Sequence, residues 1–286
     1  MFELFKDIIP YITPIFVIAT MLNVGLTQKL SDILGHLKNY SFVLKMLAAN
    51  FVAAPIVMIA MLYFAPFEPT LKAGLLIFSL CAGAPFLVKL TQTAEQELSL
   101  GAAVMMLLMV ATVAYVPIVL PSILSGLTVD AWAIARTLGI QMLLPIIVGM
   151  AAVQLLPSFA RSVQPWIGRI GNITLYALIG STLIGYAANM LAIIGTGAIL
   201  VALIFILIAF GIGYLTGAGK DHHEDVGGLG TAQRNTAAGM IIATQNFGDY
   251  PDVLVMITLA NTLGILMLMF IAKRLSRDNQ VKMETV

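Results

Sequence analysis

Residues 190–217 read MLAIIGTGAILVALIFILIAFGIGYLTG and contain no charged side chain. About twenty apolar residues in a row are enough for a helix to cross the hydrocarbon core of a bilayer. The whole chain has the same character, since 60% of its residues are hydrophobic and only 10% are charged, against about a quarter in soluble domains. Hydrocarbon offers the backbone no hydrogen-bond partner, so long apolar runs must be helical. The sequence therefore predicts an all-α polytopic membrane protein.

Working outward from this stretch, we find nine apolar windows that are long enough to span a bilayer. They cover residues 9–28, 41–65, 71–94, 98–124, 132–157, 166–188, 190–217, 226–247 and 251–273. The least marked boundary is near Asn189, because no charged residue separates the sixth window from the seventh there.

The basic residues test this number of spans, because cytoplasmic loops of membrane proteins carry an excess of Lys and Arg. With nine spans, ten of the fifteen basic residues fall on one side: Lys29, Lys38, Lys45, Arg161, Arg169, Lys220, Lys273, Arg274, Arg277 and Lys282. Three others, Lys6, Lys72 and Arg136, fall on the opposite side. We therefore expect a protein of the plasma or inner membrane whose N-terminus lies outside and whose C-terminus is cytoplasmic.

Two windows contain residues that interrupt a membrane helix. The third includes Cys81, Ala82, Gly83, Ala84 and Pro85, and the eighth includes three glycines within residues 227–230. Glycine and proline free backbone groups, which a bilayer tolerates only where protein or a water-filled cavity satisfies them. We expect both spans to be broken, near Gly83–Pro85 and Gly228–Gly230, and to cross one another.

The two interrupted windows hold similar places in the two halves of the chain. Each precedes the last span of its half, and such a pair is the best sequence indication of the binding site in an inverted-repeat transporter. The expected division is a first repeat of four spans over residues 1–125 and a second repeat of five spans over 126–275. Residues 276–286 would form a cytoplasmic tail.

Three motifs then point to a family. They are Met21-Leu22-Asn23-Val24-Gly25-Leu26, the broken window after Cys81, and Gln233-Arg234-Asn235 in the eighth window. By their order and spacing, the sequence resembles the bile acid:sodium symporter family along nearly its whole length. The resemblance implies two inverted repeats that form a panel and a core domain, with two broken helices crossing in the core. Some members lack the first of ten helices, which would give the nine windows found here.

The sodium sites that the resemblance implies lack their ligands in this sequence. A Ser-Asn pair after the first break would fall on Leu87 and Val88, which have no side-chain oxygen for a hard cation. The glutamate that serves both sodium ions falls on Gly230, and a glutamine falls on Arg234. Three amides match the family's pattern: Asn50, Asn235 and Asn261. We therefore expect no sodium coupling through the usual sites.

Two basic residues lie inside the interrupted windows, Lys89 and Arg234. All carboxylates are expected in loops or at the termini, so a cation facing inward would have no acidic partner, and such residues commonly line a pathway or bind a ligand. Fixed charges near the family's sodium positions would then suit an anionic substrate. Alternatively, Lys89 reaches the cytoplasmic surface near Glu95 and Glu97, and Arg234 binds only the carbonyl groups of a helix end.

A group of uncharged polar residues surrounds these two cations along the chain and supplies donors and acceptors for a wet cavity. It consists of Thr91, Gln92, Thr231, Gln233, Asn235 and Thr236. For each member the alternative is a hydrogen bond between helices, worth about 0.6 kcal/mol.

The leading hypothesis is a secondary transporter of a small organic anion that works by alternating access, either independent of sodium or coupled to protons. The alternatives are a sodium-coupled, bile-acid-like symporter with rearranged ion sites, and a channel or sensor without turnover. An enzyme is not expected, because His36, His222 and His223 all fall in predicted loops. We expect no cofactor, metal site or nucleic-acid partner, and the bilayer itself is the remaining partner.

Overall fold

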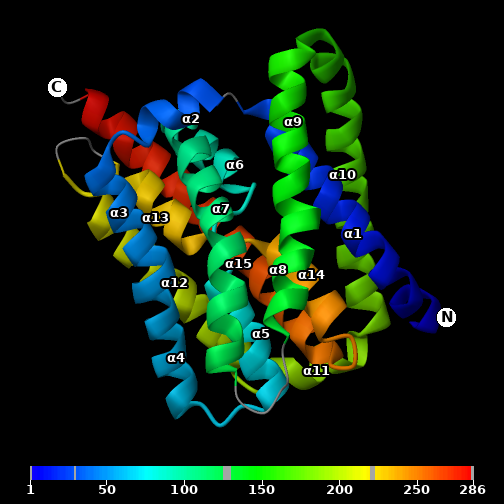
Figure 1. Cartoon of the computed structure of the whole chain (residues 1–286). Coiled ribbons are helices and arrows are strands. Elements are labelled where there is room, and N and C mark those ends of the chain that lie inside the picture. The colour runs from blue at the N-terminus through cyan, green and yellow to red at the C-terminus, as the bar shows by residue number, and fades with distance from the viewer. Residues whose placement is uncertain (1, 29, 125–129, 220–222, 285–286) are drawn as a thin grey trace.

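The computed structural model describes residues 2–28, 30–124, 130–219 and 223–284, and its regular elements are all helices (Figure 1). The helices are α1 (Phe2–Thr27), α2 (Leu30–His36), α3 (Tyr40–Ala48), η1 (Ala49–Ala53), α4 (Ala54–Phe64), α5 (Pro69–Leu80), α6 (Leu87–Thr93), α7 (Leu98–Ile123), α8 (Ala131–Leu138), η2 (Gly139–Leu143), α9 (Leu144–Leu155), α10 (Pro157–Gly185), α11 (Ala187–Ile194), α12 (Ala198–Gly217), α13 (Glu224–Ala232), α14 (Thr236–Asn246) and α15 (Pro251–Glu284).

Seven helices among the described residues are long and apolar enough to cross a membrane. They correspond to seven of the nine predicted windows, and the other two windows are the broken pairs α5–α6 and α13–α14. The all-helical, multi-pass class is therefore confirmed, whereas the inverted repeat and its division at residue 125 stay predictions. Within the predicted loops, Lys29 and Lys220 lie outside the described residues, as does the side chain of Lys282.

Some boundaries differ from the predicted windows. Helix α10 begins at Pro157, although the sixth window begins at residue 166, and α15 continues to Glu284. Hydropathy detects only the part of a helix that lies in hydrocarbon, while polar turns such as the one with Arg161 extend a helix beyond it. The seventh window is divided, because α11 ends at Ile194 and Gly197, with a φ of +83°, precedes α12.

Two helices contain a π-helical segment two residues before a proline. η1 (Ala49–Ala53) precedes Pro55 and η2 (Gly139–Leu143) precedes Pro145. Proline has no N–H for the carbonyl four residues earlier, so the ladder of hydrogen bonds must rearrange around it. At η1 the carbonyl of Phe51 instead accepts a 2.6 Å hydrogen bond from the hydroxyl of Tyr115 on α7.

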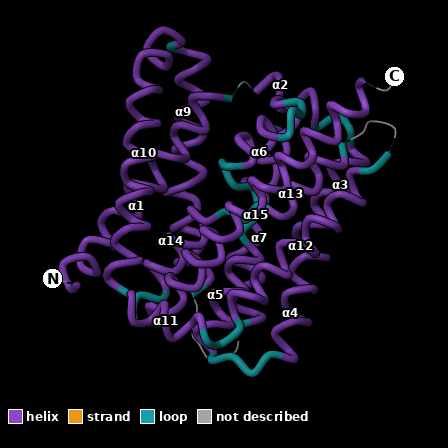
Figure 2. Tube along the Cα trace, turned by 180° about the vertical axis from the view of Figure 1, so that it is seen from behind, coloured by secondary structure: helices purple, strands orange, loops and turns teal. Residues whose placement is uncertain are grey.

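The helices form two groups, which we call the panel and the core. The panel consists of α1, the continuous helix α8–η2–α9, and α10, and the core consists of α3 to α7 and α12 to α15 (Figures 1 and 2). Glycines allow a close approach within the panel, since a Cβ on Gly149 of α9 would lie 2.6 Å from the carbonyl oxygen of Leu22 on α1. The core includes both broken helix pairs.

Two polar contacts lie near the turn between α14 and α15, one from the panel helix α8 and one from α11, which belongs to neither group. The hydroxyl of Thr137 on α8 lies 3.1 Å from Oε1 of Gln245 on α14. The amide of Asn189 on α11 donates a 2.7 Å hydrogen bond to the carboxylate of Asp252 on α15. We call the contact of Thr137 with Gln245 the panel–core seam.

Candidate functional site

The two broken helices meet at their breaks. Helix α5 ends at Leu80 and α6 begins at Leu87, while α13 ends at Ala232 and α14 begins at Thr236. Ala82 and Arg234 form an antiparallel β-bridge. Next to it, the backbone N–H of Asn235 donates a 2.8 Å hydrogen bond to the carbonyl of Cys81. The two unwound segments thus provide hydrogen-bond partners for part of each other's backbone N–H and C=O groups, which a membrane interior requires.

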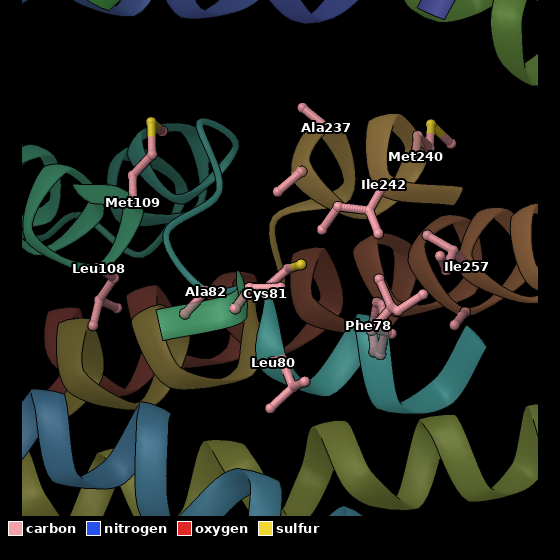
Figure 3. Packing of buried hydrophobic residues seen from close by; sticks show 14 of the residues in the cluster. Phe78, Leu80, Cys81, Ala82, Leu108, Met109, Ala237, Met240, Ile242 and Ile257 are labelled. Atoms are coloured by element: carbon pink, nitrogen blue, oxygen red, sulfur yellow. The ribbon is translucent and has the colours of Figure 1, made fainter. Parts of the chain in front are cut away.

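Figure 3 shows the surroundings of the first break. Cys81 and Ala82 lie between α7, which contributes Leu108 and Met109, and α14, which contributes Ala237 and Ile242. The break at Gly83–Pro85 is therefore confirmed, because residues 81–86 separate α5 from α6.

The predicted position of the second break is wrong. Gly228 and Gly230 lie inside α13, and the chain leaves the helix only at Gln233. The glycines of this helix serve close packing, since a Cβ on Gly213 of α12 would meet the carbonyl oxygen of Gly227 and lie 2.6 Å from Cβ of Thr231. A glycine-rich stretch therefore marks a tight helix–helix contact here rather than an interruption.

The side chain of Asn235 forms hydrogen bonds with both breaks. Its Oδ1 accepts the amide of Ala238 at 3.1 Å and so caps α14, while its Nδ2 donates to the carbonyl of Gly83 at 2.9 Å. The residue is 1% exposed. An N-cap asparagine satisfies a donor of the first helical turn that has no partner in the helix. The amide predicted from the sequence thus lies at the centre of the crossing.

Thr112 on α7 also forms hydrogen bonds with the first break, and sequence reasoning missed this residue. Its hydroxyl donates to the carbonyl of Ala82 and accepts from the amide of Ala82, both at 3.0 Å. The residue is fully buried. The available signal was a hydroxyl in the middle of an apolar window, since such groups in membrane helices commonly bond across to another segment.

Arg234 is buried in the core with 1% of its surface exposed. Its Nη1 donates a 3.0 Å hydrogen bond to the carbonyl of Ser79 in the last turn of α5, and its Cζ lies 5.2 Å from the ring centre of Phe205 on α12. Its Nε and Nη2 are buried without a hydrogen-bond partner, and it forms no ion pair within the described part of the chain. A positive charge is thus enclosed beside the crossing.

Lys89 does not join Arg234 inside the core. It lies on an exposed face of α6, where its ammonium group donates a 3.0 Å hydrogen bond to Oε1 of Gln92. Whether the side chain reaches the cytoplasmic surface, as the alternative for Lys89 has it, stays a prediction. Gln92 is exposed with it, so these two predicted site residues form a separate pair.

We expect Lys89→Met to leave transport nearly unchanged, because the side chain is exposed and its hydrogen bond goes to an exposed glutamine. Exposed polar contacts of this kind contribute little, about 0–1 kcal/mol. The measurement is the initial rate of substrate uptake in proteoliposomes. A loss of more than tenfold with normal folding would place the ammonium group on the substrate pathway.

The remaining predicted residues are buried at different places in the core. The amide of Asn50 donates to the hydroxyl of Thr231 at 3.1 Å and thereby joins η1 to α13. Gln233 contacts the carbonyl of Arg234 at 3.4 Å. The hydroxyl of Thr91 donates to the carbonyl of Leu87 at 2.9 Å within α6, and Asn261 is 5% exposed on α15.

The positions that correspond to the implied sodium ligands are close together and apolar. A Cβ on Gly230 would lie 2.9 Å from Cγ1 of Val104, 3.4 Å from Cδ2 of Leu87 and 3.4 Å from Cε of Met46. Leu87 and Met46 are fully buried. These side chains fill the space beside Gly230 with hydrocarbon, which provides no ligand for a hard cation.

Glu224 and Asp225, which the sequence predicts in a loop, lie in the first turn of α13. Asp225 is 7% exposed and accepts a 2.9 Å hydrogen bond from the side-chain amide of Gln96. Acidic residues are favourable at that end of a helix because of its dipole. This bond links α13 to the turn between α6 and α7.

The histidines are also partly described. His36 ends α2 rather than lying in a loop, and its Nε2 lies 2.9 Å from the hydroxyl of Ser99. His223 packs edge-on against Phe42, and His222 lies outside the described residues.

Comparison with known proteins supplies the identity of the fold. The model of the Sodium Bile acid symporter family matches residues 14–216, from α1 to α12. The chain belongs to this family. The matched region includes the first break of the symporter-family fold, while Arg234 and Asn235 lie beyond it. No curated protein matches the sequence. Membership makes the chain a secondary transporter with several membrane-spanning helices, and not an enzyme.

Proposed function

We propose that this symporter-family protein carries a small organic anion by alternating access and does not use sodium at the family's usual sites. The observation that carries the proposal is that the apolar side chains of Leu87, Val104 and Met46 fill the space beside Gly230. The resemblance places a shared carboxylate at Gly230 and an oxygen-bearing residue at Leu87. Without both, a sodium ion would lose its main counter-charge and its oxygen ligands together.

The buried charge of Arg234 supports the same conclusion. An added sodium ion would be repelled by the guanidinium at a cost of about 4 kcal/mol for two unit charges 4 Å apart at an effective dielectric of 20. A fixed positive charge also makes the neighbourhood of the crossing favourable for an anion. With Lys89 on the exposed face of α6, Arg234 is the predicted cation that remains to attract the substrate.

The orientation belongs to the same proposal. The excess of Lys and Arg on one side favours an external N-terminus and a cytoplasmic C-terminus, and the two broken helix pairs favour two inverted repeats. Rocking of the panel against the core around the crossing would then expose the substrate alternately on the two sides. A proton as coupling ion stays open, as does transport without a coupling ion.

The test is uptake by purified protein in liposomes with sodium replaced by choline at constant pH. Labelled monocarboxylates such as acetate and lactate serve as probes, after a thermal-stability screen has selected those that bind. We expect saturable uptake and counterflow that do not change when sodium is removed. Liposomes without protein provide the baseline.

Two results would contradict the proposal. A strict requirement for sodium would show a rearranged cation site and the sodium-coupled alternative. An ohmic current without saturation or counterflow would identify a channel rather than a carrier.

A further inference from the structure

The guanidinium of Arg234 has one edge that no described residue uses. Its Nη1 end is held by the carbonyl of Ser79 at 3.0 Å, and one face of its plane lies against Phe205. The two atoms without partners, Nε and Nη2, are neighbours on the opposite edge. Their N–H bonds lie in the plane of the group and point in nearly the same direction.

Such an edge is costly when it is empty and buried. Buried donors without a partner lose their bonds to water, and a buried charge without a counter-charge loses more. Nearly all other buried polar side-chain atoms of the described residues have a hydrogen-bond partner. The rest of the crossing is well satisfied, since Asn235 and Thr112 pair with the backbone of both breaks. The free edge of Arg234 therefore offers two donors that a ligand would satisfy.

We propose that this edge binds the carboxylate of a monovalent anion, side-on and through two parallel hydrogen bonds from Nε and Nη2. A carboxylate presents two oxygens in one plane, and that spacing matches the planar fork of arginine. A single negative charge also balances the single charge of the guanidinium. Chloride has no such pair of acceptors. Two of the three oxygens of a sulfonate can meet the fork, but they are less basic and therefore weaker acceptors than carboxylate oxygens.

The burial of Arg234 sets a condition on access. The side chain is 1% exposed, so a carboxylate reaches it only when the segments around the crossing move apart. A bound carboxylate would then stabilise the closed crossing. That the same carboxylate belongs to the transported substrate rests on the proposed function, whereas binding at the free edge can be tested by itself.

The experiment measures the thermal unfolding of the purified full-length protein at constant ionic strength. Sodium acetate, sodium formate, sodium chloride and sodium methanesulfonate are compared, and each supplies a monovalent anion. We expect acetate and formate to raise the midpoint of unfolding saturably in the wild type, as ligands of a folded state do. Chloride should have an at least tenfold weaker effect, and methanesulfonate should have a weaker effect than either carboxylate.

Variants of Arg234 test whether the carboxylate-dependent shift of the unfolding midpoint arises at this residue. Arg234→Gln should lose the carboxylate-dependent shift, and Arg234→Lys, which keeps the charge without the fork, should weaken binding at least tenfold. Lys89→Gln is the matched control, because it removes an exposed cation from the same region and should bind acetate as the wild type does. If the Arg234 variants do not fold, saturation transfer from wild-type protein to ¹³C-acetate, and its loss on adding unlabelled formate, tests the binding of a carboxylate, and its absence would contradict the inference.

Several outcomes would overturn the inference. Equal effects of chloride and acetate would show a site for any small anion, and no effect of either carboxylate would show that the edge is empty. A retained shift in Arg234→Gln would place the site elsewhere. Sodium-independent uptake without a carboxylate shift would leave the proposed function in place, and a carboxylate shift with strictly sodium-dependent uptake would leave only this inference.

Discussion

Replacing Gly83 with alanine should abolish uptake and greatly reduce the yield of folded protein. Gly83 has a φ of +75°, a left-handed conformation that costs an L-residue roughly 1–2 kcal/mol. The added Cβ would also contact the backbone of α7, at the amide of Met109 and 2.7 Å from the carbonyl oxygen of Met105. Backbone atoms in a packed helix cannot move aside as a flexible side chain can, so the crossing must shift.

The matched control is Gly35→Ala in α2, where an added Cβ meets nothing within 4 Å. Alanine in a helix is favoured over glycine by about 1 kcal/mol, so this variant should be at least as stable as the wild type. The measurements are size-exclusion profiles after heating and initial uptake rates. A Gly83→Ala protein that folds and transports normally would show that the break is not fixed by its contact with α7.

Arg234→Gln should lower the apparent affinity for the transported anion on the order of 100-fold. A hydrogen bond to a charged group contributes about 1.5–3 kcal/mol, so the loss of one of the two bonds, at about 2.8 kcal/mol, corresponds to a factor of about 100 in affinity. Glutamine keeps one donor but neither the charge nor the fork. The measurement is the concentration dependence of uptake in proteoliposomes.

The folding of this variant must be compared directly with the wild type, because Arg234 also bonds to Ser79 at the end of α5. Lys89→Gln provides the comparison for the loss of a positive charge at the surface. Full activity and unchanged affinity in Arg234→Gln would leave the guanidinium with a structural role only, as a clamp on the carbonyl of Ser79.

Hydropathy predicted the helical class and the seven long helices because burial in hydrocarbon depends on local composition. It also predicted the first break, where Gly83 and Pro85 interrupt an apolar window. It misplaced the second break, since glycines that interrupt a helix and glycines that pack one helix on another look alike in a sequence. Only the tertiary contact of Gly227 with Gly213 distinguishes them.

The sequence predicted which residues lie near the crossing, but not where each of their side chains points. Arg234 and Asn235 were both expected at the crossing, and both are buried there. Lys89 was an open question, because a short helix after a break can turn a long side chain either inward or to the surface. Thr112, Phe205 and the carbonyl of Ser79 could not be assigned in advance, since they come from other helices that only the fold brings to the crossing.

The panel–core seam bears on the energy difference between the two arrangements that a carrier must visit. When Thr137 and Gln245 separate, water replaces their contact, so the net change is about 1 kcal/mol. The contacts of α1 with α14 and of α7 with α8 add to the cost of separating the panel from the core. A polar contact that water can replace therefore contributes only a small part of the energy that holds the panel against the core.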